Sequence, residues 1–143
     1  MNKIISAIIG FSLLAFCGSV KCEWSGEVFS RKDVDLICKT VCCEANTQDF
    51  EAKYMVALTI LNRYYNGMGE SIRDVIYKKN AYSVTKWKSF EHTEYDENVL
   101  EAVLMAFKEN RHPQDMYYFR TKHYHEFGKP YTVSDDLYFS TEK

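Results

Sequence analysis

The first helical pattern in the chain begins at residue 30. Ser30 is followed three residues later by Asp33, a pairing typical of a helix start. Apolar residues then recur three or four positions apart, which predicts a helix that runs to about Glu44 or Ala45. The apolar positions of this helix are Val34, Ile37, Cys38, Val41 and Cys42.

A second and clearer helical pattern follows a polar break at residues 46–49, which supplies a new cap. It predicts a helix over residues 50–65 that ends at Asn66 and Gly67. We expect this helix to face the core with one apolar stripe. The stripe comprises Phe50, Tyr54, Ala57, Leu58, Leu61 and Tyr65.

Two further helices are expected before the C-terminal part. Ser71 and Asp74 mark the start of a short helix that ends at Tyr77 or Lys78. A polar loop then runs from residue 79 to about residue 96. The last helix covers residues 96–110 and is stopped by His112 and Pro113, with Val99, Leu100, Val103, Leu104 and Phe107 pointing inward.

The C-terminal part changes to short aromatic and β-branched runs. Residues 116–119, 131–133 and 137–139 suit short strands. The last two strands are separated by the turn-prone residues 134–136. The pattern therefore predicts an α+β fold that is mainly α, with a small antiparallel β element at its C-terminal end.

Composition narrows the class of protein. A length of 143 residues fits one domain, and 46% apolar with 15% aromatic residues is too apolar for a disordered chain. The formal net charge of −2 argues against a protein that coats nucleic acid through its basic surface.

The N-terminal segment differs from the rest of the chain. Lys3 precedes an uncharged apolar run that continues to Val20, with small residues near its end. This layout predicts a signal peptide over residues 1–22 and a single mature domain over residues 23–143. An uncleaved membrane anchor and a buried core helix are the alternatives. We expect export to the periplasm or to the extracellular cell wall, with tethering to the membrane before release if cleavage does not occur.

Export bears on the five cysteines. Cleavage near Ser19 leaves Cys22, Cys38, Cys42 and Cys43, and oxidising compartments favour disulfides. The pairing stays open, although a bridge between the adjacent Cys42 and Cys43 would be strained.

Glu44 is the first candidate for chemistry. It stands where a helix rich in apolar residues gives way to a polar loop. A partly desolvated carboxyl at this place suits a general acid near neutral pH. The alternative is an exposed glutamate at a helix end.

Histidines and cysteines raise two other kinds of site. His123 and His125 together with cysteines suggest zinc, but no Cys-x-x-Cys pair exists and the spacing matches no familiar zinc pattern. Cys42 or Cys43 with a histidine base suggests a nucleophilic thiol, but their place near a helix C-terminus opposes thiolate formation. The plainer interpretation is a polar loop, and we expect no metal and no cofactor.

Aromatic residues in polar company suit stacking against sugar rings. The chain has eleven Tyr, nine Phe and two Trp, although most tyrosines in proteins are simply half-buried. Those in polar surroundings are Tyr82, Trp87, Phe90, Tyr117, Tyr118, Tyr124 and Tyr131.

Two longer motifs resemble the spore-cortex-lytic enzyme or cell-wall hydrolase (SleB-like) family. Residues 41–45, Val-Cys-Cys-Glu-Ala, resemble the end of its first helix, and residues 50–63 resemble its next helix, which ends in Leu-Asn-Arg. The similarity covers about residues 33–140. Its further motifs match Asp74–Tyr77, Tyr82-Ser83, Tyr117–Phe119 and Tyr131–Phe139.

The resemblance implies a lysozyme-like, mostly helical fold that acts on peptidoglycan glycan strands. It implies that Glu44 is the catalytic acid, and members resemble lytic transglycosylases. One carboxyl would protonate the glycosidic oxygen between N-acetylmuramic acid and N-acetylglucosamine and then take the proton of the muramoyl C6 hydroxyl, which gives a 1,6-anhydro end. Substrate contacts are expected from Tyr82 and Ser83 at the cleft floor and from Tyr118, His123 and Tyr131 opposite.

The chain departs from the family at two places. Cys42 and Cys43 replace an aromatic and a small residue before the glutamate, and Ala81 stands where the family has glutamine in Gln-Phe-Ser. Water-using glycosidases normally need a second carboxyl, and none stands out here. The candidates are Glu51, one turn into the second helix, and the turn residues Asp135 and Asp136.

These observations predict an exported peptidoglycan-degrading enzyme, a lytic transglycosylase with Glu44 as acid and base. We expect a monomer that binds glycan strands, binds no nucleic acid, and meets the membrane only transiently through its N-terminal segment. The alternatives are a cell-wall amidase, which usually needs zinc, and a non-catalytic secreted wall-binding protein on the same fold.

Overall fold

The computed structural model describes residues 22–24, 27–86 and 88–143. The predicted signal segment, apart from Cys22, therefore lies outside the described residues. Within them, no helix has the length and apolar character needed to cross a membrane. The elements in chain order are β1 (Cys22–Trp24), β2 (Glu27–Phe29), α2 (Arg31–Ala45), α3 (Phe50–Tyr65), α4 (Ile72–Tyr77), the 3-10 turns η1 (Ser83–Lys86) and η2 (Phe90–His92), α5 (Glu97–Lys108), β3 (Met116–Thr121), β4 (Lys129–Ser134) and β5 (Leu137–Thr141).

The helix starts follow the capping signals of the sequence. Ser30 and Asp33 form a complete capping box at the start of α2. Asp49 accepts the backbone N–H of Ala52 at the start of α3, and Ser71 caps α4 in the same way. These ends confirm the predicted helices, and the loop expected over residues 79–96 contains the turns η1 and η2.

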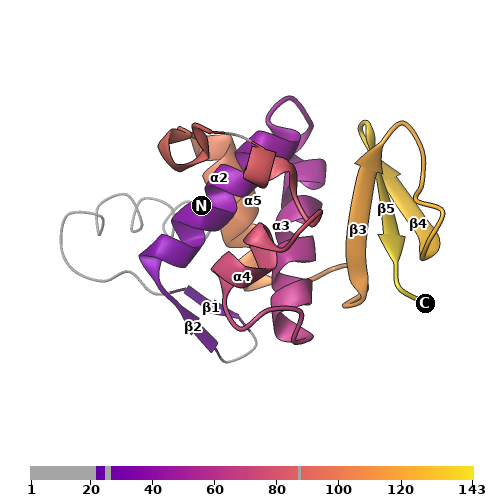
Figure 1. Cartoon of the computed structure of the whole chain (residues 1–143), viewed down its shortest axis with the longest axis horizontal. Helices are drawn as coiled ribbons and strands as arrows, with labels where there is room; N and C mark the ends of the chain where they lie inside the picture. Colours follow the sequence, from indigo (N-terminus) through magenta and orange to yellow (C-terminus); the bar gives the residue numbers. More distant parts are fainter. Residues whose placement is uncertain (1–21, 25–26, 87) are drawn as a thin grey trace, which may run out of the picture.

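Helix α3 is the centre of the fold (Figure 1), because α2, α4, α5 and β3 all pack against it. All residues from Ala52 to Arg63 are buried, so the predicted single apolar stripe is wrong. Its last expected member, Tyr65, is 50% exposed. A helix surrounded on every side has no solvent face, and its polar residues must find partners inside the protein. Lys53, for example, donates from Nζ to Oδ1 of Asn98 at 2.8 Å.

Helix α3 ends in a turn that requires glycine. The N–H of Met68 donates to the carbonyl of Arg63 at 2.9 Å, and that of Gly67 donates to the carbonyl of Tyr64 at 3.0 Å. This pattern is a Schellman motif, and its central residue needs a positive φ. Gly67 supplies it with φ of 75°. The turn therefore brings the backbone of Met68 back to Arg63, one turn earlier in the helix.

Helix α5 presents a different set of residues to the core from the one expected. Ala102 and Ala106 are fully buried together with Val99, Val103 and Phe107. Leu100 and Leu104, which were expected to point inward, are only half-buried. The small alanine side chains let α5 approach α3 closely, so the leucines lie at the edges of the contact.

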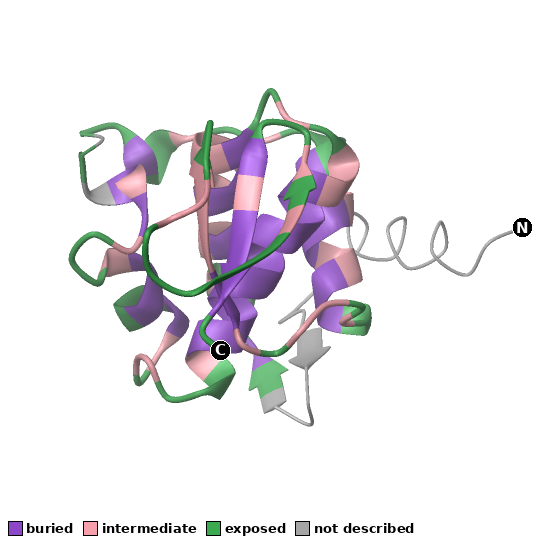
Figure 2. Ribbon diagram, turned by 90° about the vertical axis from the view of Figure 1, so that its right-hand side faces the viewer, coloured by how far each residue is buried: buried purple, intermediate pink, exposed green. Residues whose placement is uncertain are grey.

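The three C-terminal strands form an antiparallel sheet with the order β3-β5-β4. This sheet confirms the predicted fold class, mainly helical with a small C-terminal β element. Strand β5 is the central and most buried strand, and β4 is an exposed edge. Figure 2 looks onto the sheet and shows the buried helices behind it, with exposed residues along the loops in front. The sheet meets the helices through β3 and α3.

Candidate active site

Glu44 lies in the last turn of α2, three residues after the buried Val41. This spacing places it at the edge of the buried face, and its side chain is half-buried. Its Oε1 accepts two hydrogen bonds from Ser83, one from the backbone N–H at 2.5 Å and one from Oγ at 2.7 Å. Ser83 begins η1, so this turn holds the carboxyl in one orientation.

Tyr82, the residue before Ser83, anchors this turn in the core. It is 4% exposed, and its hydroxyl lies 3.0 Å from Oγ1 of Thr59 on α3. Burial raises the pKa of the Tyr82 phenol, against the charge of Arg63 and the Thr59 hydrogen bond, and the charge of Glu44 raises it further. Tyr82 is therefore a buried support between Glu44 and α3.

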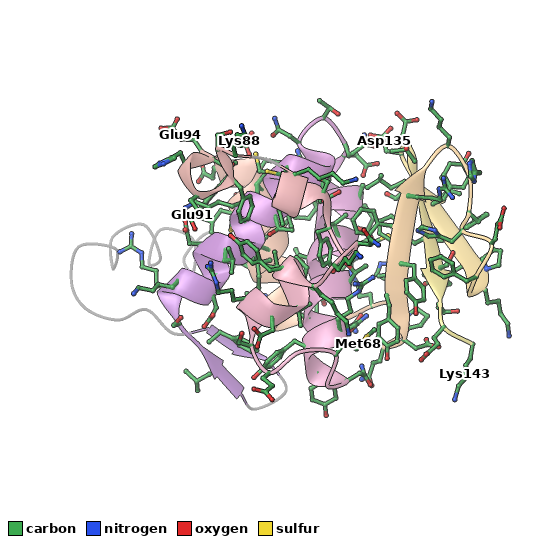
Figure 3. All side chains as sticks on the ribbon, in the orientation of Figure 1. Met68, Lys88, Glu91, Glu94, Asp135 and Lys143 are labelled. Atoms are coloured by element: carbon green, nitrogen blue, oxygen red, sulfur yellow. The ribbon has the colours of Figure 1, made fainter. Side chains whose placement is uncertain are left out.

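A pocket of about 400 Å³ opens beside Glu44. In Figure 3, Lys88, Glu91 and Glu94 mark the loop from which Ser89, His92 and Thr93 line this pocket. Among the described residues that line the pocket, Glu44 is the only one with a carboxyl group. The lining consists of Cys42, Cys43, Glu44, Asn46, Thr47, Ser89, His92 and Thr93.

The two cysteines of the pocket are thiols with weak partners. Sγ of Cys42 donates to the carbonyl of Glu94 at 3.4 Å, and Sγ of Cys43 lies 3.7 Å from Oγ1 of Thr93. Burial is the largest cause that raises the pKa of both thiols. For Cys42, the charges of Cys43 and Asp96 raise the pKa further and that of Lys53 lowers it. For Cys43, the hydrogen bond with Thr93 lowers the pKa and the charge of Glu44 raises it. A raised thiol pKa leaves little thiolate at neutral pH, which opposes the nucleophile hypothesis.

The disulfides expected from export do not form among the described cysteines. Cys38, Cys42 and Cys43 are not joined in any disulfide, and the side chain of Cys22 lies outside the described part of the chain. The physical reason is their placement on α2. Cys38 is fully buried in the core, whereas Cys42 and Cys43 contact the loop around Thr93 and Glu94.

The structure separates the two histidines of the predicted polar loop. His123 is exposed, with Nδ1 3.0 Å from the carbonyl oxygen of Tyr124. His125 is half-buried, with Nε2 3.1 Å from the carbonyl oxygen of Phe119. Within the part of the chain that the structure describes, no group of three His, Cys, Asp or Glu side chains is arranged to hold a metal ion.

Tyr131 belongs to a chain of contacts that joins the sheet to α3. Its hydroxyl lies 3.0 Å from Nδ1 of His112, and Nε2 of His112 lies 2.9 Å from Oε1 of Glu51. Arg111 contacts the other oxygen of Glu51 at 3.3 Å. Glu51 is thus engaged here, outside the pocket that Glu44 lines.

The structure brings Ser83 and the buried Tyr82 next to Glu44, but neither of them lines the pocket beside Glu44, and the other three candidate substrate contacts lie elsewhere. Tyr118 lines a second pocket, and His123 and Tyr131 line neither of these two pockets. Sequence reasoning missed Ser89, His92 and Thr93, because an irregular loop carries no periodic signal. Arg63, which lines the second pocket, could have been noticed in the sequence, because a charged residue inside a long apolar helix requires an explanation.

Comparison with known proteins identifies a family and two similar solved structures. A family model described as "Cell Wall Hydrolase" matches residues 47–139, which begin just after Glu44. The catalytic domain of the Bacillus cereus SleB protein has 18% sequence identity and a TM-score of 0.69, covering 79% of this chain and 92% of that one. A Bacillus anthracis domain, described as that of a germination-specific lytic transglycosylase SleB, has 17% identity and a TM-score of 0.69, covering 79% and 97%. No curated protein matches the sequence.

Proposed function

The chain belongs to the cell wall hydrolase family, which confirms the resemblance seen in its motifs, and on that premise we propose that it cuts peptidoglycan glycan strands as a lytic transglycosylase. The SleB domains share its fold. The observation that carries the proposal is Glu44, a carboxyl fixed by Ser83 at the wall of an open pocket.

The chemistry needs one carboxyl in two protonation states. The protonated Glu44 donates its proton to the glycosidic oxygen between N-acetylmuramic acid and N-acetylglucosamine. The resulting carboxylate then accepts the proton of the muramoyl C6 hydroxyl, whose oxygen attacks the anomeric carbon and closes the 1,6-anhydro ring. Because the nucleophile belongs to the substrate, no second carboxyl is required, whereas glycosidases that use water have two within roughly 5–9.5 Å. The lining of the pocket, with Glu44 as its single acid among the described residues, supports this route.

Digestion of purified sacculi tests the proposal. The chain should release muropeptides with 1,6-anhydro ends, identified by mass spectrometry, and Glu44→Gln should release none. Glu97→Gln is the matched control, because this exposed glutamate in the first turn of α5 does not line the pocket. Equal activity of Glu44→Gln and the unmodified chain would exclude the assigned role. Binding to sacculi without release of fragments would instead support a wall-binding protein.

Export completes the proposal. We propose that residues 1–22 carry the domain across the membrane to the compartment that holds its polymer. N-terminal sequencing of the mature protein should find a free end near residues 20–23. An intact N-terminus in the membrane fraction would show instead that the segment remains as an anchor.

A further inference from the structure

A second pocket, of about 250 Å³, is lined by Arg63, whose guanidinium lies over the ring of Tyr82. Its cationic lining residues are Arg63, Lys78 and Lys79, and its walls include the rings of Tyr118, His125 and Phe127. Among the described residues that line it, none is acidic. This combination of positive charge and aromatic surface distinguishes it from the pocket beside Glu44.

Arg63 is the unusual member of this pocket. Its side chain comes from the buried helix α3 and is only 9% exposed. Nε donates to the carbonyl of Tyr117 at 2.9 Å, and the guanidinium lies over the rings of Tyr82 and Tyr118, 5.2 and 5.5 Å from their centroids. Among the described residues, no carboxylate forms a salt bridge with it.

A buried guanidinium without a carboxylate is costly, and two aromatic faces offset that cost only in part. Nε is used by the protein, whereas the terminal nitrogens have no hydrogen-bond partner among the described residues. The planar fork of arginine matches the two oxygens of a carboxylate. The pocket therefore offers an anion a guanidinium that the Tyr117 carbonyl and two aromatic rings already hold in place.

The aromatic wall is fixed by a glycine. Gly128 has φ of 78°, and a Cβ atom there would lie 2.5 Å from the carbonyl oxygen of Thr141. Only glycine allows this close approach. The turn holds Phe127 against Tyr118, with centroids 5.0 Å apart, and stacks His125 on Phe127 at 4.4 Å. The wall thus forms a shaped surface beside the guanidinium, although Phe127 is 55% exposed.

We propose that this pocket binds a carboxylate carried by the peptidoglycan strand, so that the enzyme reads a muramoyl residue close to the bond cut at Glu44. This inference rests on the proposed function. Tyr82 connects the two places, because its ring lies under Arg63 while the next residue, Ser83, holds Glu44. The carboxylate comes either from the lactyl group of a muramoyl residue without peptide or from a stem peptide.

Binding measurements on the Glu44→Gln chain test the proposal without cleavage. The probes are a GlcNAc–MurNAc disaccharide with a free lactyl carboxylate, the same disaccharide with that group amidated, and the disaccharide bearing a short stem peptide. By calorimetry, a carboxylate-bearing probe should bind roughly tenfold to a hundredfold more tightly than the amidated one. The tighter of the two charged probes identifies the source of the carboxylate. Equal affinity for charged and neutral probes, or binding of none, overturns the proposal.

Variants locate the site. The double variant Lys78→Gln/Lys79→Gln, at the exposed rim, should weaken binding of the charged probe several-fold and leave the neutral probe unchanged. Arg63→Gln should abolish the preference, and its circular dichroism spectrum shows whether it folds. Lys108→Gln, an exposed lysine on α5 that does not line the pocket, is the matched control. In the Glu44→Gln chain, NMR signals of the Arg63 Nε–H should shift on titration with the charged probe, and unchanged signals would contradict the assignment.

The two proposals fail separately. A chain that prefers the charged probe but cuts no sacculi would overturn the proposed function and keep the carboxylate site. A chain that cuts sacculi without preferring the charged probe would overturn only the inference about this pocket.

Discussion

Removing the hydroxyl of Ser83 probes how the protein fixes its catalytic carboxyl. Oγ of Ser83 donates to Oε1 of Glu44 at 2.7 Å, and the backbone N–H of Ser83 donates to the same oxygen at 2.5 Å. Ser83→Ala removes the first bond and keeps the second. The carboxyl should therefore stay near its position but rotate more freely.

The magnitude follows from the kind of bond that is lost. A hydrogen bond to a charged group contributes about 1.5–3 kcal/mol. The lower end applies here, because Ser83 and Glu44 are half-buried and one bond remains. A loss of about 1.4 kcal/mol in the transition state corresponds to about a tenfold lower kcat/KM.

The assay is the initial rate of fragment release from labelled sacculi, with thermal unfolding measured on the same samples. Ser83→Thr keeps the hydroxyl and is the matched control, which should retain most of the activity. Ser83→Ala with unchanged kcat/KM would refute the idea that this bond positions Glu44. A loss as large as that of Glu44→Gln would also contradict it, because the backbone bond alone should maintain part of the geometry.

Two further predictions concern the core and the thiols. Asn62 is fully buried, and its Nδ2 donates to the carbonyls of Pro113 and Met116. Asn62→Ala should therefore lower the free energy of unfolding, measured in urea, by about 3 kcal/mol. A change below about 1 kcal/mol would contradict the role of these two hydrogen bonds. Burial raises the pKa of Cys42 and Cys43, so iodoacetamide should label these thiols slowly at neutral pH and faster as the pH rises towards their pKa. Mass spectrometry follows the labelling. Fast labelling at neutral pH would contradict the raised pKa, because it would show that a thiolate is present.

Local signals in the sequence predicted much of the fold. The capping box at Ser30, the cap at Asp49 and the stop at Gly67 act within a few residues, so the ends of α2 and α3 could be placed from the sequence. The environment of α3 could not be predicted in this way. Whether Arg63 and Tyr65 are buried depends on what packs around the helix, and that is decided by segments far away in the chain.

The candidate site shows the same division. Glu44 could be identified from the end of a helical pattern and from the motif around it. Its bond to Ser83 joins residues 39 positions apart, and the wall formed by His92 and Thr93 comes from an irregular loop. Tertiary packing creates such contacts, and neither periodicity nor capping reports them. For the same reason, only the structure reveals the contact between the Cys42 thiol and the carbonyl of Glu94.

The role of Glu44 is tested most directly by the origin of the oxygen at the new muramoyl end. Sacculi are digested in water labelled with a heavy oxygen isotope, and the reducing ends are analysed by mass spectrometry. If Glu44 promotes attack by the substrate's own C6 hydroxyl, the unmodified chain produces 1,6-anhydro ends that contain no label, and Glu44→Gln produces no new ends. Labelled reducing ends would contradict the account, because they would show that water is the nucleophile and that a second group must activate it.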